Sequence, residues 1–164
     1  MIEPQSAGNW LCLGNTENQV RRDKVQVQSQ APLQQLPRRI PKMTDNEQLV
    51  RDFINAWPRL DPDELVGFFH PEGTYHNMPL APAVGRDGIR AMISGFISSW
   101  RATEWEVLNL ISAGPIVVAE RVDRMDTEQG PVALPVVGVF ELEGGQIKAW
   151  RDYFDLASYT NQLA

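Results

Sequence analysis

The sequence predicts an α+β domain in which three helices cover one concave face of an antiparallel sheet that follows them in the chain. Three observations carry this prediction. Apolar residues recur at helical spacing between residues 44 and 100, the period then changes from 3.6 to 2, and short turns rich in Gly separate four extended segments. Helices first and strands afterwards is an order typical of α+β domains.

The helices have recognisable start and stop signals. Thr44 and Glu47 match the capping box, which predicts a helix from there to Pro58. Asp61-Pro62 predicts a second helix that stops at His70-Pro71-Glu72-Gly73, and a third is expected from about Gly85 to Trp100. The apolar residues expected on their buried faces are Leu49, Val50, Phe53, Ile54 and Trp57; Leu65, Val66, Phe68 and Phe69; and Ile89, Met92, Ile93, Phe96, Ile97 and Trp100.

Strands are predicted before and after the third helix. Residues 74–78 are expected to form only a short strand, because Pro79 and Pro82 prevent it from continuing. Four longer strands are expected near residues 103–113, 115–126, 131–143 and 146–155, with turn residues between them that indicate an antiparallel meander. A short helix from Ala157 to Leu163 is expected to close the open end of the sheet.

Length and composition indicate one folded domain. The 164 residues, 43% hydrophobic and 22% charged, suit a single globular unit. Residues 1–43 are rich in Gln, Asn and Pro, so we expect a flexible extension there and the folded domain over residues 44–164. Met43 is a candidate natural start, which would make the preceding residues an upstream extension of the reading frame.

Charge and cysteine content exclude several classes of function. Residues 1–43 carry six basic and three acidic side chains, a charge of +3, which leaves −9 for the acidic remainder and argues against a nucleic-acid partner. The single cysteine, Cys12, indicates neither a disulfide framework nor a zinc site. Without an apolar run of 18 residues or a secretory signal, a cytoplasmic protein with no membrane contact is expected.

Two of the predicted strands place charged residues on apolar faces. Strand alternation puts Arg121 and Asp123 on the face of Val117 and Ala119, and it groups Asp152 with Trp150 and Phe154. If both faces line the concave side, Arg121 lies between two carboxylates in unlike surroundings, which separates their pKa values. Taken alone, the strand period is more typical of a plain salt bridge between Arg121 and Asp123, with Asp152 and Asp155 facing solvent or loop amides.

The short strand adds two polar residues on one side. Tyr75 and Asn77 alternate onto the same face, where a phenol and an amide can orient a water molecule. Taken alone, the pattern is more typical of Tyr75 as a core residue and Asn77 as a turn residue. His76 points to the opposite side. His70, before a proline at the expected helix end, is interpreted as a cap.

These motifs together resemble a known family. The strings Tyr75-His76-Asn77-Met78-Pro79, Glu120-Arg121-Val122-Asp123, Gly138-Val139-Phe140 and Trp150-Arg151-Asp152-Tyr153-Phe154-Asp155 resemble the limonene-1,2-epoxide hydrolase family in order and approximate spacing. The resemblance covers roughly residues 44–160. It implies the cone-like α+β fold of nuclear transport factor 2 and ketosteroid isomerase, with a curved mixed sheet, and a catalytic domain over residues 44–164.

The resemblance also implies a reaction and the residues that perform it. Asp152, with Tyr75 and Asn77, would hold and deprotonate a water molecule, protonated Asp123 would donate to the epoxide oxygen, and Arg121 would bridge the two carboxylates. The product would be a vicinal diol formed without a covalent intermediate, a metal or an organic cofactor. Met125, Trp150 and Phe154 are expected to line a pocket for a small lipophilic epoxide.

Two other functions stay open at this point. The same cone supports isomerases and cyclases that use one carboxylate to move a proton, and it supports small-ligand binders without activity. An isomerase or cyclase would leave Arg121 and the second aspartate without a task. A homodimer through the sheet is expected, because Val137 and Val139 give the outer sheet face an apolar character.

Overall fold

The computed structural model describes residues 43–164, so the expectations for the earlier part of the chain lie outside the described residues. Its helices are α1 (Asp45–Ala56), η1 (Trp57–Arg59, a 3-10 helix), α2 (Pro62–Gly67), α3 (Gly85–Ile97) and α4 (Leu156–Thr160). Its strands are β1 (Phe69–Asn77), β2 (Ala83–Val84), β3 (Trp100–Ala113), β4 (Ile116–Thr127), β5 (Gly130–Glu143) and β6 (Gln146–Tyr153). None of these helices is long and apolar enough to cross a membrane.

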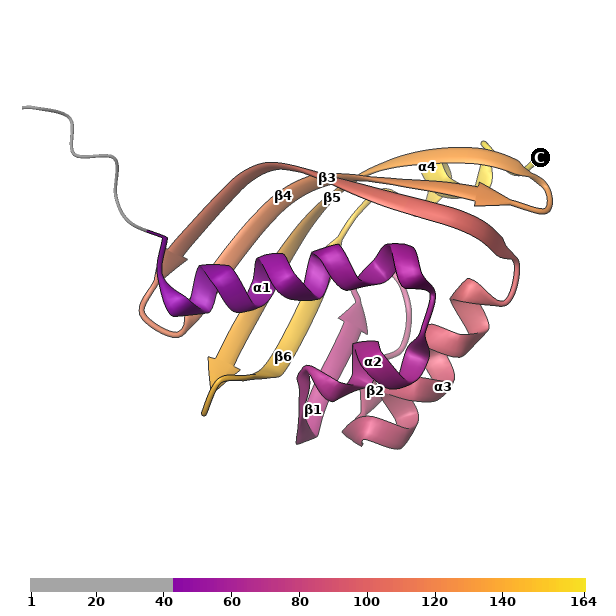
Figure 1. Cartoon of the computed structure of the whole chain (residues 1–164). Helices are drawn as coiled ribbons and strands as arrows, with labels where there is room; N and C mark the ends of the chain where they lie inside the picture. Colours follow the sequence, from indigo (N-terminus) through magenta and orange to yellow (C-terminus); the bar gives the residue numbers. More distant parts are fainter. Residues whose placement is uncertain (1–42) are drawn as a thin grey trace, which may run out of the picture. The chain divides into compact units, whose positions relative to one another are not determined.

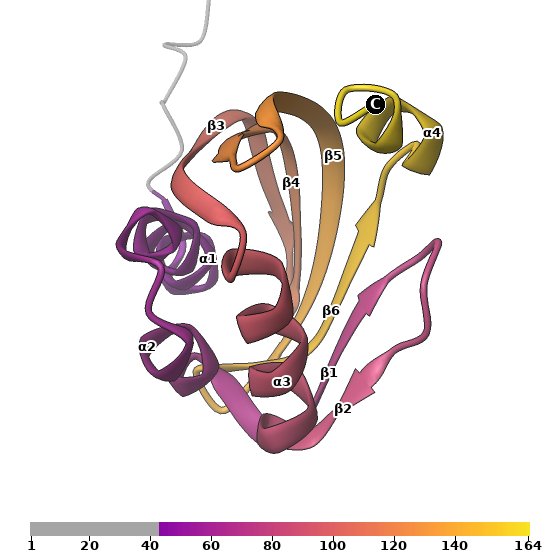
Figure 2. The ribbon, with the colours of Figure 1, turned by 90° about the vertical axis from the view of Figure 1, so that its right-hand side faces the viewer.

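A curved sheet carries the first three α-helices on one side. The strand order is β2-β1-β6-β5-β4-β3, and β3 to β6 form the predicted antiparallel meander. Figure 1 shows α1 running across the sheet, and Figure 2 shows α1, α2 and α3 on the concave side with α4 near one end. The predicted α+β class, with helices on a curved mixed sheet, is confirmed.

The first helix begins as its sequence predicts. Both hydrogen bonds of the capping box are present: Thr44 Oγ1 accepts from the Glu47 amide at 3.1 Å, and Glu47 Oε2 accepts from the Thr44 amide at 2.8 Å. Val50, Phe53 and Ile54 face the sheet and are buried. Phe53 packs against the rings of Phe69, Phe140 and Trp150, among others, so α1 is fixed over the centre of the sheet.

The boundary between α2 and β1 differs from the prediction. The helix ends at Gly67, and Phe69 is the first residue of a strand that includes the expected stop signal at residues 70–73. This strand pairs in parallel with β6, and the register shifts between Phe69 and Thr74, which accommodates Pro71. His70 therefore caps no helix. Its Nδ1 accepts from the Glu72 amide at 3.1 Å within β1.

Three further boundaries differ from the sequence-based expectations. The third helix ends at Ile97 and Trp100 is already in β3, because the chain turns there to enter the meander. Residues 83–84 form β2, a short edge strand directly after Pro82 that was not predicted. The C-terminal helix starts one residue earlier than expected and ends at Thr160, with the Asp155 side chain accepting from the Ala157 amide at 3.0 Å.

The core has a large part and a small part. The large cluster lies between the helices and the sheet and includes Trp57, Phe69 and Trp150. The small cluster lies toward α4, where Met125, Val132, Leu134 and Val136 are buried against Phe154 and Tyr159, among others. The polar residues described below lie where these two regions meet.

Candidate active site

A buried arginine joins two aspartates on the concave face of the sheet. Arg121, fully buried on β4, donates from Nε to Asp123 Oδ1 at 2.8 Å and from Nη2 to Asp152 Oδ2 at 2.5 Å. Asp123 and Asp152 are themselves only 5% and 3% exposed. The predicted arrangement, in which Arg121 bridges two carboxylates from different strands, is therefore present, and Asp152 does not face solvent.

A glycine makes room for this bridge. Gly138 on β5 is the cross-strand neighbour of Ala119 on one side and of Asp152 on the other. A Cβ atom at this position would overlap Arg121 Nη1 and would lie 2.9 Å from Asp152 Oδ1. That Gly138 makes room for the bridge was not predicted from the sequence. A glycine inside an apolar strand often marks a close approach by another group, so its position was the available signal.

Aromatic rings surround the bridge. The Arg121 guanidinium lies 4.7 Å from the ring of Trp105 and 5.5 Å from that of Trp150, which is the range of cation–π contacts. Trp150 also donates from Nε1 to Asp152 Oδ1 at 2.6 Å. Asp152 thus accepts hydrogen bonds from both Arg121 and Trp150, whereas Asp123 accepts from Arg121 through Oδ1 only.

The parallel pairing of β1 with β6 adds the phenol and the amide. It aligns Tyr75 with Trp150 and Asn77 with Asp152. The Tyr75 hydroxyl donates to Asn77 Oδ1 at 3.1 Å, and the Tyr75 ring stacks on Trp150 with 4.0 Å between centroids. This hydrogen bond leaves the lone pairs of the phenol oxygen and the amide hydrogens of Asn77 free to hold a small polar molecule.

Burial shifts the pKa values of the two aspartates and of Tyr75. Burial, with a smaller contribution from the Asp152 charge, raises the pKa of Asp123 to about 6 against the opposing effect of Arg121. Burial also raises the pKa of Asp152, opposed by Arg121 and by the Trp150 indole. Burial disfavours the charge of Arg121, but the two carboxylates raise the pKa of its guanidinium. Burial also raises the pKa of Tyr75 well above the usual value, so Tyr75 stays a neutral phenol.

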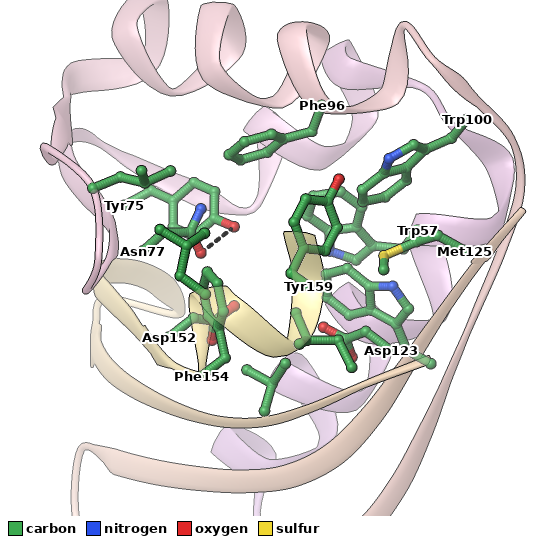
Figure 3. Close-up of a pocket in the computed structure, with 15 residues that line it drawn as sticks. Trp57, Tyr75, Asn77, Phe96, Trp100, Asp123, Met125, Asp152, Phe154 and Tyr159 are labelled. Carbon is green, nitrogen blue, oxygen red and sulfur yellow. Dashed lines mark hydrogen bonds between the residues drawn. The ribbon is translucent and has the colours of Figure 1, made fainter. Parts of the chain in front are cut away.

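These side chains border a cavity of about 100 Å³. Its lining residues are Trp57, Tyr75, Asn77, Leu80, Phe96, Trp100, Trp105, Asp123, Met125, Leu134, Val136, Asp152, Phe154, Leu156 and Tyr159. Figure 3 shows both aspartates at its lower side, with Tyr75 and Asn77 on one flank. Of the predicted lining residues, Met125 and Phe154 border the cavity, whereas Trp150 is fully buried and is absent from its wall.

The sequence reasoning missed part of the wall. Trp57, Trp100 and Trp105 border the cavity together with Leu134, Leu156 and Tyr159. Their only sequence signal was apolar or aromatic character, which does not separate a core residue from a lining residue. Two of them, Leu156 and Tyr159, come from α4, so the C-terminal helix contributes to the pocket.

The arrangement combines an acid, a base and a neutral pair of hydrogen-bonding groups at one cavity. A carboxyl group with a pKa near 6 can donate a proton, a carboxylate held by two donors can accept one, and a phenol–amide pair can orient water. Within residues 43–164, no three His, Cys, Asp or Glu side chains form a group that could hold a metal ion.

Comparisons with solved structures give the same fold. The chain is similar to an LEH-like epoxide hydrolase from M. tuberculosis, with 26% identity over 75% of this chain and 92% of that chain, at a TM-score of 0.65. It is also similar to a protein of ketosteroid isomerase-like fold from Catenulispora acidiphila, at 24% identity, 70% and 91% coverage and a TM-score of 0.65. A third similar structure is that of a protein assigned as a SnoaL-like polyketide cyclase from Shewanella putrefaciens. The identity is 18% over 74% of this chain and 98% of that chain, at a TM-score of 0.68.

The family follows from a match at the level of sequence. The two structures below 25% identity indicate the fold alone. A family model described as the SnoaL-like domain matches residues 50–150, which is more than half of the chain and includes Arg121, Asp123 and strands β1 to β5. The chain therefore belongs to the family of SnoaL-like domains.

Proposed function

We propose that the protein is an epoxide hydrolase of the limonene-1,2-epoxide hydrolase type, which adds water to a small lipophilic epoxide and releases a vicinal diol. The observation that carries the proposal is the buried bridge from Asp123 through Arg121 to Asp152, with both carboxylates on the wall of an otherwise largely apolar cavity. Epoxide opening needs a proton donor on one side of the ring and an activated water on the other.

The reaction proceeds in one step. Asp152 accepts a proton from a water molecule held by Tyr75 and Asn77, and the water oxygen forms a bond to one epoxide carbon. The bond between that carbon and the ring oxygen breaks, and Asp123 gives its proton to this oxygen. The step leaves Asp152 protonated and Asp123 ionised, so one proton must return to Asp123 before the next turnover.

The hydrogen bonds support this division of tasks. Asp152 accepts from Arg121 at 2.5 Å and from Trp150 at 2.6 Å, and both bonds favour the ionised form that a base requires. Asp123 accepts from Arg121 through one oxygen, and a pKa raised to about 6 favours the protonated form that an acid requires. The two groups titrate as a coupled pair, which keeps one proton between them.

The likeness to other proteins supports the same reaction. The M. tuberculosis LEH-like epoxide hydrolase, at 26% identity, covers 75% of this chain. The string from Trp150 to Asp155 resembles the limonene-1,2-epoxide hydrolase family, and each of the five polar residues proposed to act is present. We include residues 44–164 in the catalytic domain on this basis.

An isomerase, a cyclase and a ligand binder are the competing functions. An isomerase or cyclase can use one carboxylate as the base and a second, protonated aspartate as an oxyanion donor, but neither task requires one arginine to bind both carboxylates. A binder requires neither. We therefore place both below the hydrolase.

The test is diol formation from limonene oxide and cyclohexene oxide by the purified protein and by the Asp123→Asn and Asp152→Asn variants. Each substitution should lower kcat/KM by about 10²- to 10⁴-fold, since each removes one partner of general acid–base catalysis. Asp126→Asn, at an exposed aspartate on the same strand, is the matched control and should leave turnover unchanged. A folded wild type that hydrolyses no epoxide would contradict the proposal.

A further inference from the structure

Two indole N–H groups at the cavity have no hydrogen-bond acceptor. Trp57 Nε1 and Trp100 Nε1 are both buried, and neither has a partner among the described residues. Both tryptophans border the cavity that contains the two aspartates. Native proteins rarely leave a buried donor unpaired, because the group loses its bond to water and gains nothing in return.

The other tryptophans that the structure describes are paired. Trp105 Nε1 donates to Thr103 Oγ1 at 3.0 Å, and Trp150 Nε1 donates to Asp152 Oδ1 at 2.6 Å. The fold thus supplies an acceptor for each indole next to the Arg121 bridge. The two tryptophans whose indoles lack an acceptor, Trp57 and Trp100, both border the cavity.

The two unpaired indoles lie close together and apart from Asn77 and Asp152. The Trp57 and Trp100 rings lie 6.0 Å apart, and Trp57 stacks at 4.2 Å on Trp105, which separates it from Arg121. Figure 3 shows Trp57 and Trp100 across the pocket from Asn77 and Asp152, with the Trp100 nitrogen on the side of its ring that is turned toward the pocket.

The neighbouring wall does not satisfy these donors. Around them the cavity is lined by apolar side chains such as Phe96 and Leu134, by Met125, whose sulfur is a weak acceptor, and by Tyr159, whose hydroxyl forms no hydrogen bond with either indole. None of these side chains carries a charge that could balance an anionic ligand. A bound molecule can therefore supply the acceptor that both indoles lack, and a neutral acceptor suits this uncharged wall.

Building on the proposed function, we infer that the natural substrate is an oxygenated lipophilic epoxide. It carries a ketone, ester, ether or hydroxyl oxygen at the end remote from the epoxide ring, and this oxygen accepts from Trp57 and Trp100 while the ring lies at Asp123 and Asp152. A pure hydrocarbon epoxide would fill the same space and leave both indoles unpaired. The two tryptophans are thus specificity-determining residues.

The kinetic test uses two epoxides of one shape. The first is limonene 1,2-epoxide, and the second is the ketone in which oxygen replaces the =CH2 group of its side chain. The wild type should favour the ketone in kcat/KM by about threefold to tenfold, the expected scale for one or two net hydrogen bonds. Trp57→Phe and Trp100→Phe should bring this ratio to one or below while hydrolysis of limonene epoxide persists.

Phe96→Leu is the control, because it alters the same wall without removing a donor, and it should change both rates alike. A ratio near one in the wild type, or a ratio that neither tryptophan substitution alters, would overturn the inference. It would mean that the indoles meet at most a water molecule.

A binding measurement separates this inference from the proposed reaction. Limonene and its matching ketone, both without the epoxide, are added to ¹⁵N-labelled protein, and the indole ¹H–¹⁵N signals of Trp57 and Trp100 are assigned with the two Phe variants. The ketone should move these signals downfield and limonene should not. This shift without turnover of any epoxide would refute the hydrolase and keep the subsite, whereas turnover without the shift or the preference would do the reverse.

Discussion

The Arg121 guanidinium has no contact with solvent, and its charge meets two carboxylates. One positive charge can balance only one of the two negative charges that Asp123 and Asp152 would carry. In a buried site the remaining negative charge is costly, so the pair keeps one proton up to about pH 6. The residue that bridges the two groups thereby also determines how many protons they hold.

This protonation predicts how activity changes with pH. Asp123 must be protonated to act as the acid, and its pKa is raised to about 6. We expect kcat/KM to fall as the pH rises through this region, because the acid is lost, and to fall again in more acidic solution as Asp152 becomes protonated. A pH–rate profile of epoxide hydrolysis measures both limbs. A profile that is flat from pH 5 to 8 would contradict these assignments.

Stability should follow the same titration. Folding raises the pKa of Asp123 from 3.8 to about 6, so the folded protein binds this proton more tightly than the unfolded chain does. The free energy of unfolding therefore decreases as the pH rises from about 4 to 6, by at most about 3 kcal/mol, and stays at the lower value above that range. Urea unfolding across this range should show the decrease in the wild type and a smaller one in Asp123→Asn.

Gly138→Ala should disable the site while the sheet persists. The added Cβ would overlap Arg121 Nη1 and approach Asp152 Oδ1 to 2.9 Å, so the bridge must shift. We expect a loss of about 10²-fold in kcat, from misplaced catalytic groups, and a destabilisation of about 1–3 kcal/mol. The pH–rate profile should move as well, since Asp152 changes its distance to Arg121.

Gly95→Ala is the matched control for that substitution. Gly95 lies inside α3, and nothing stands within 4 Å of the position a Cβ would take. This change should leave kcat unaltered and raise the free energy of unfolding by about 0.5–1 kcal/mol, because alanine favours the helix. If Gly138→Ala behaves like Gly95→Ala in kinetics, the close approach at Gly138 has no part in the reaction.

Much of the candidate site could be predicted from the sequence, and the part that could not has a physical reason. Strand alternation placed Arg121 and Asp123 on one buried face, and the structure confirms that face. Strand alternation does not indicate which strands are neighbours. The positions of Asp152 and Gly138 beside Arg121 are therefore known only from the register of the sheet. Trp57 and Trp100 read as core residues because a lining residue has the same periodicity.

At the scale of the elements, α4 is a helix too short to be stable alone, and the side chain of Gln162 connects it to the sheet. Gln162 accepts from the Ala133 amide at 2.9 Å and donates to the Ala133 carbonyl at 3.2 Å, where β5 extends beyond its pairing with β6. The Gln162 amide thus takes the place of a neighbouring strand. Through this contact α4 holds Leu156 and Tyr159 at the cavity.

Gln162→Ala should therefore weaken substrate binding more than chemistry. We expect KM to rise by about threefold to tenfold, as one or two hydrogen bonds are lost, while kcat changes little because no catalytic group moves. Steady-state kinetics on limonene oxide separate the two constants. Asn161→Ala, at the exposed neighbouring position, should leave both unchanged, and an unaltered KM in Gln162→Ala would contradict a positioning function for this contact.

The helices and strands were predicted well where their signals are local. The cap at Thr44 and the turns of the meander involve residues a few positions apart, and these boundaries agree with the structure to within about three residues. The start of β1 was wrong, because Phe69 to Gly73 extend only by pairing with β6 at the other end of the chain. Proline and glycine in that stretch imitate a turn when the partner strand is unknown.

At the scale of the whole molecule, the outer face of the sheet predicts self-association. Ile111, Val118 and Val139 are successive cross-strand neighbours, and Val137 pairs with Tyr153 beside them. Ile111 is 65% exposed, Val137 39% and Tyr153 45%. Exposed apolar residues grouped on a sheet face, here bordered by Glu120 and Arg151, suit a second copy of the same face, so we propose a homodimer.

Val137→Arg should convert this dimer into a monomer, because association would bury an unpaired charge. Val84→Arg, at an apolar residue that is 67% exposed on the edge strand β2, is the control and should leave the dimer intact. Sedimentation or gel filtration at micromolar concentration reports the mass of each. A wild type that is monomeric under these conditions would contradict the proposal.

The parallel pairing of β1 with β6 also orders the events by which the chain acquires its site. Strands β3 to β6 can pair as successive hairpins, and this local pairing is enough to bring Arg121, Asp123 and Asp152 together. Tyr75 and Asn77 join only when β1 closes a long loop onto β6, which is slow because of its entropy. On the ribosome β6 is the last strand to emerge, so a nascent chain contains Arg121 and Asp123 before it contains Asp152 or a partner strand for β1.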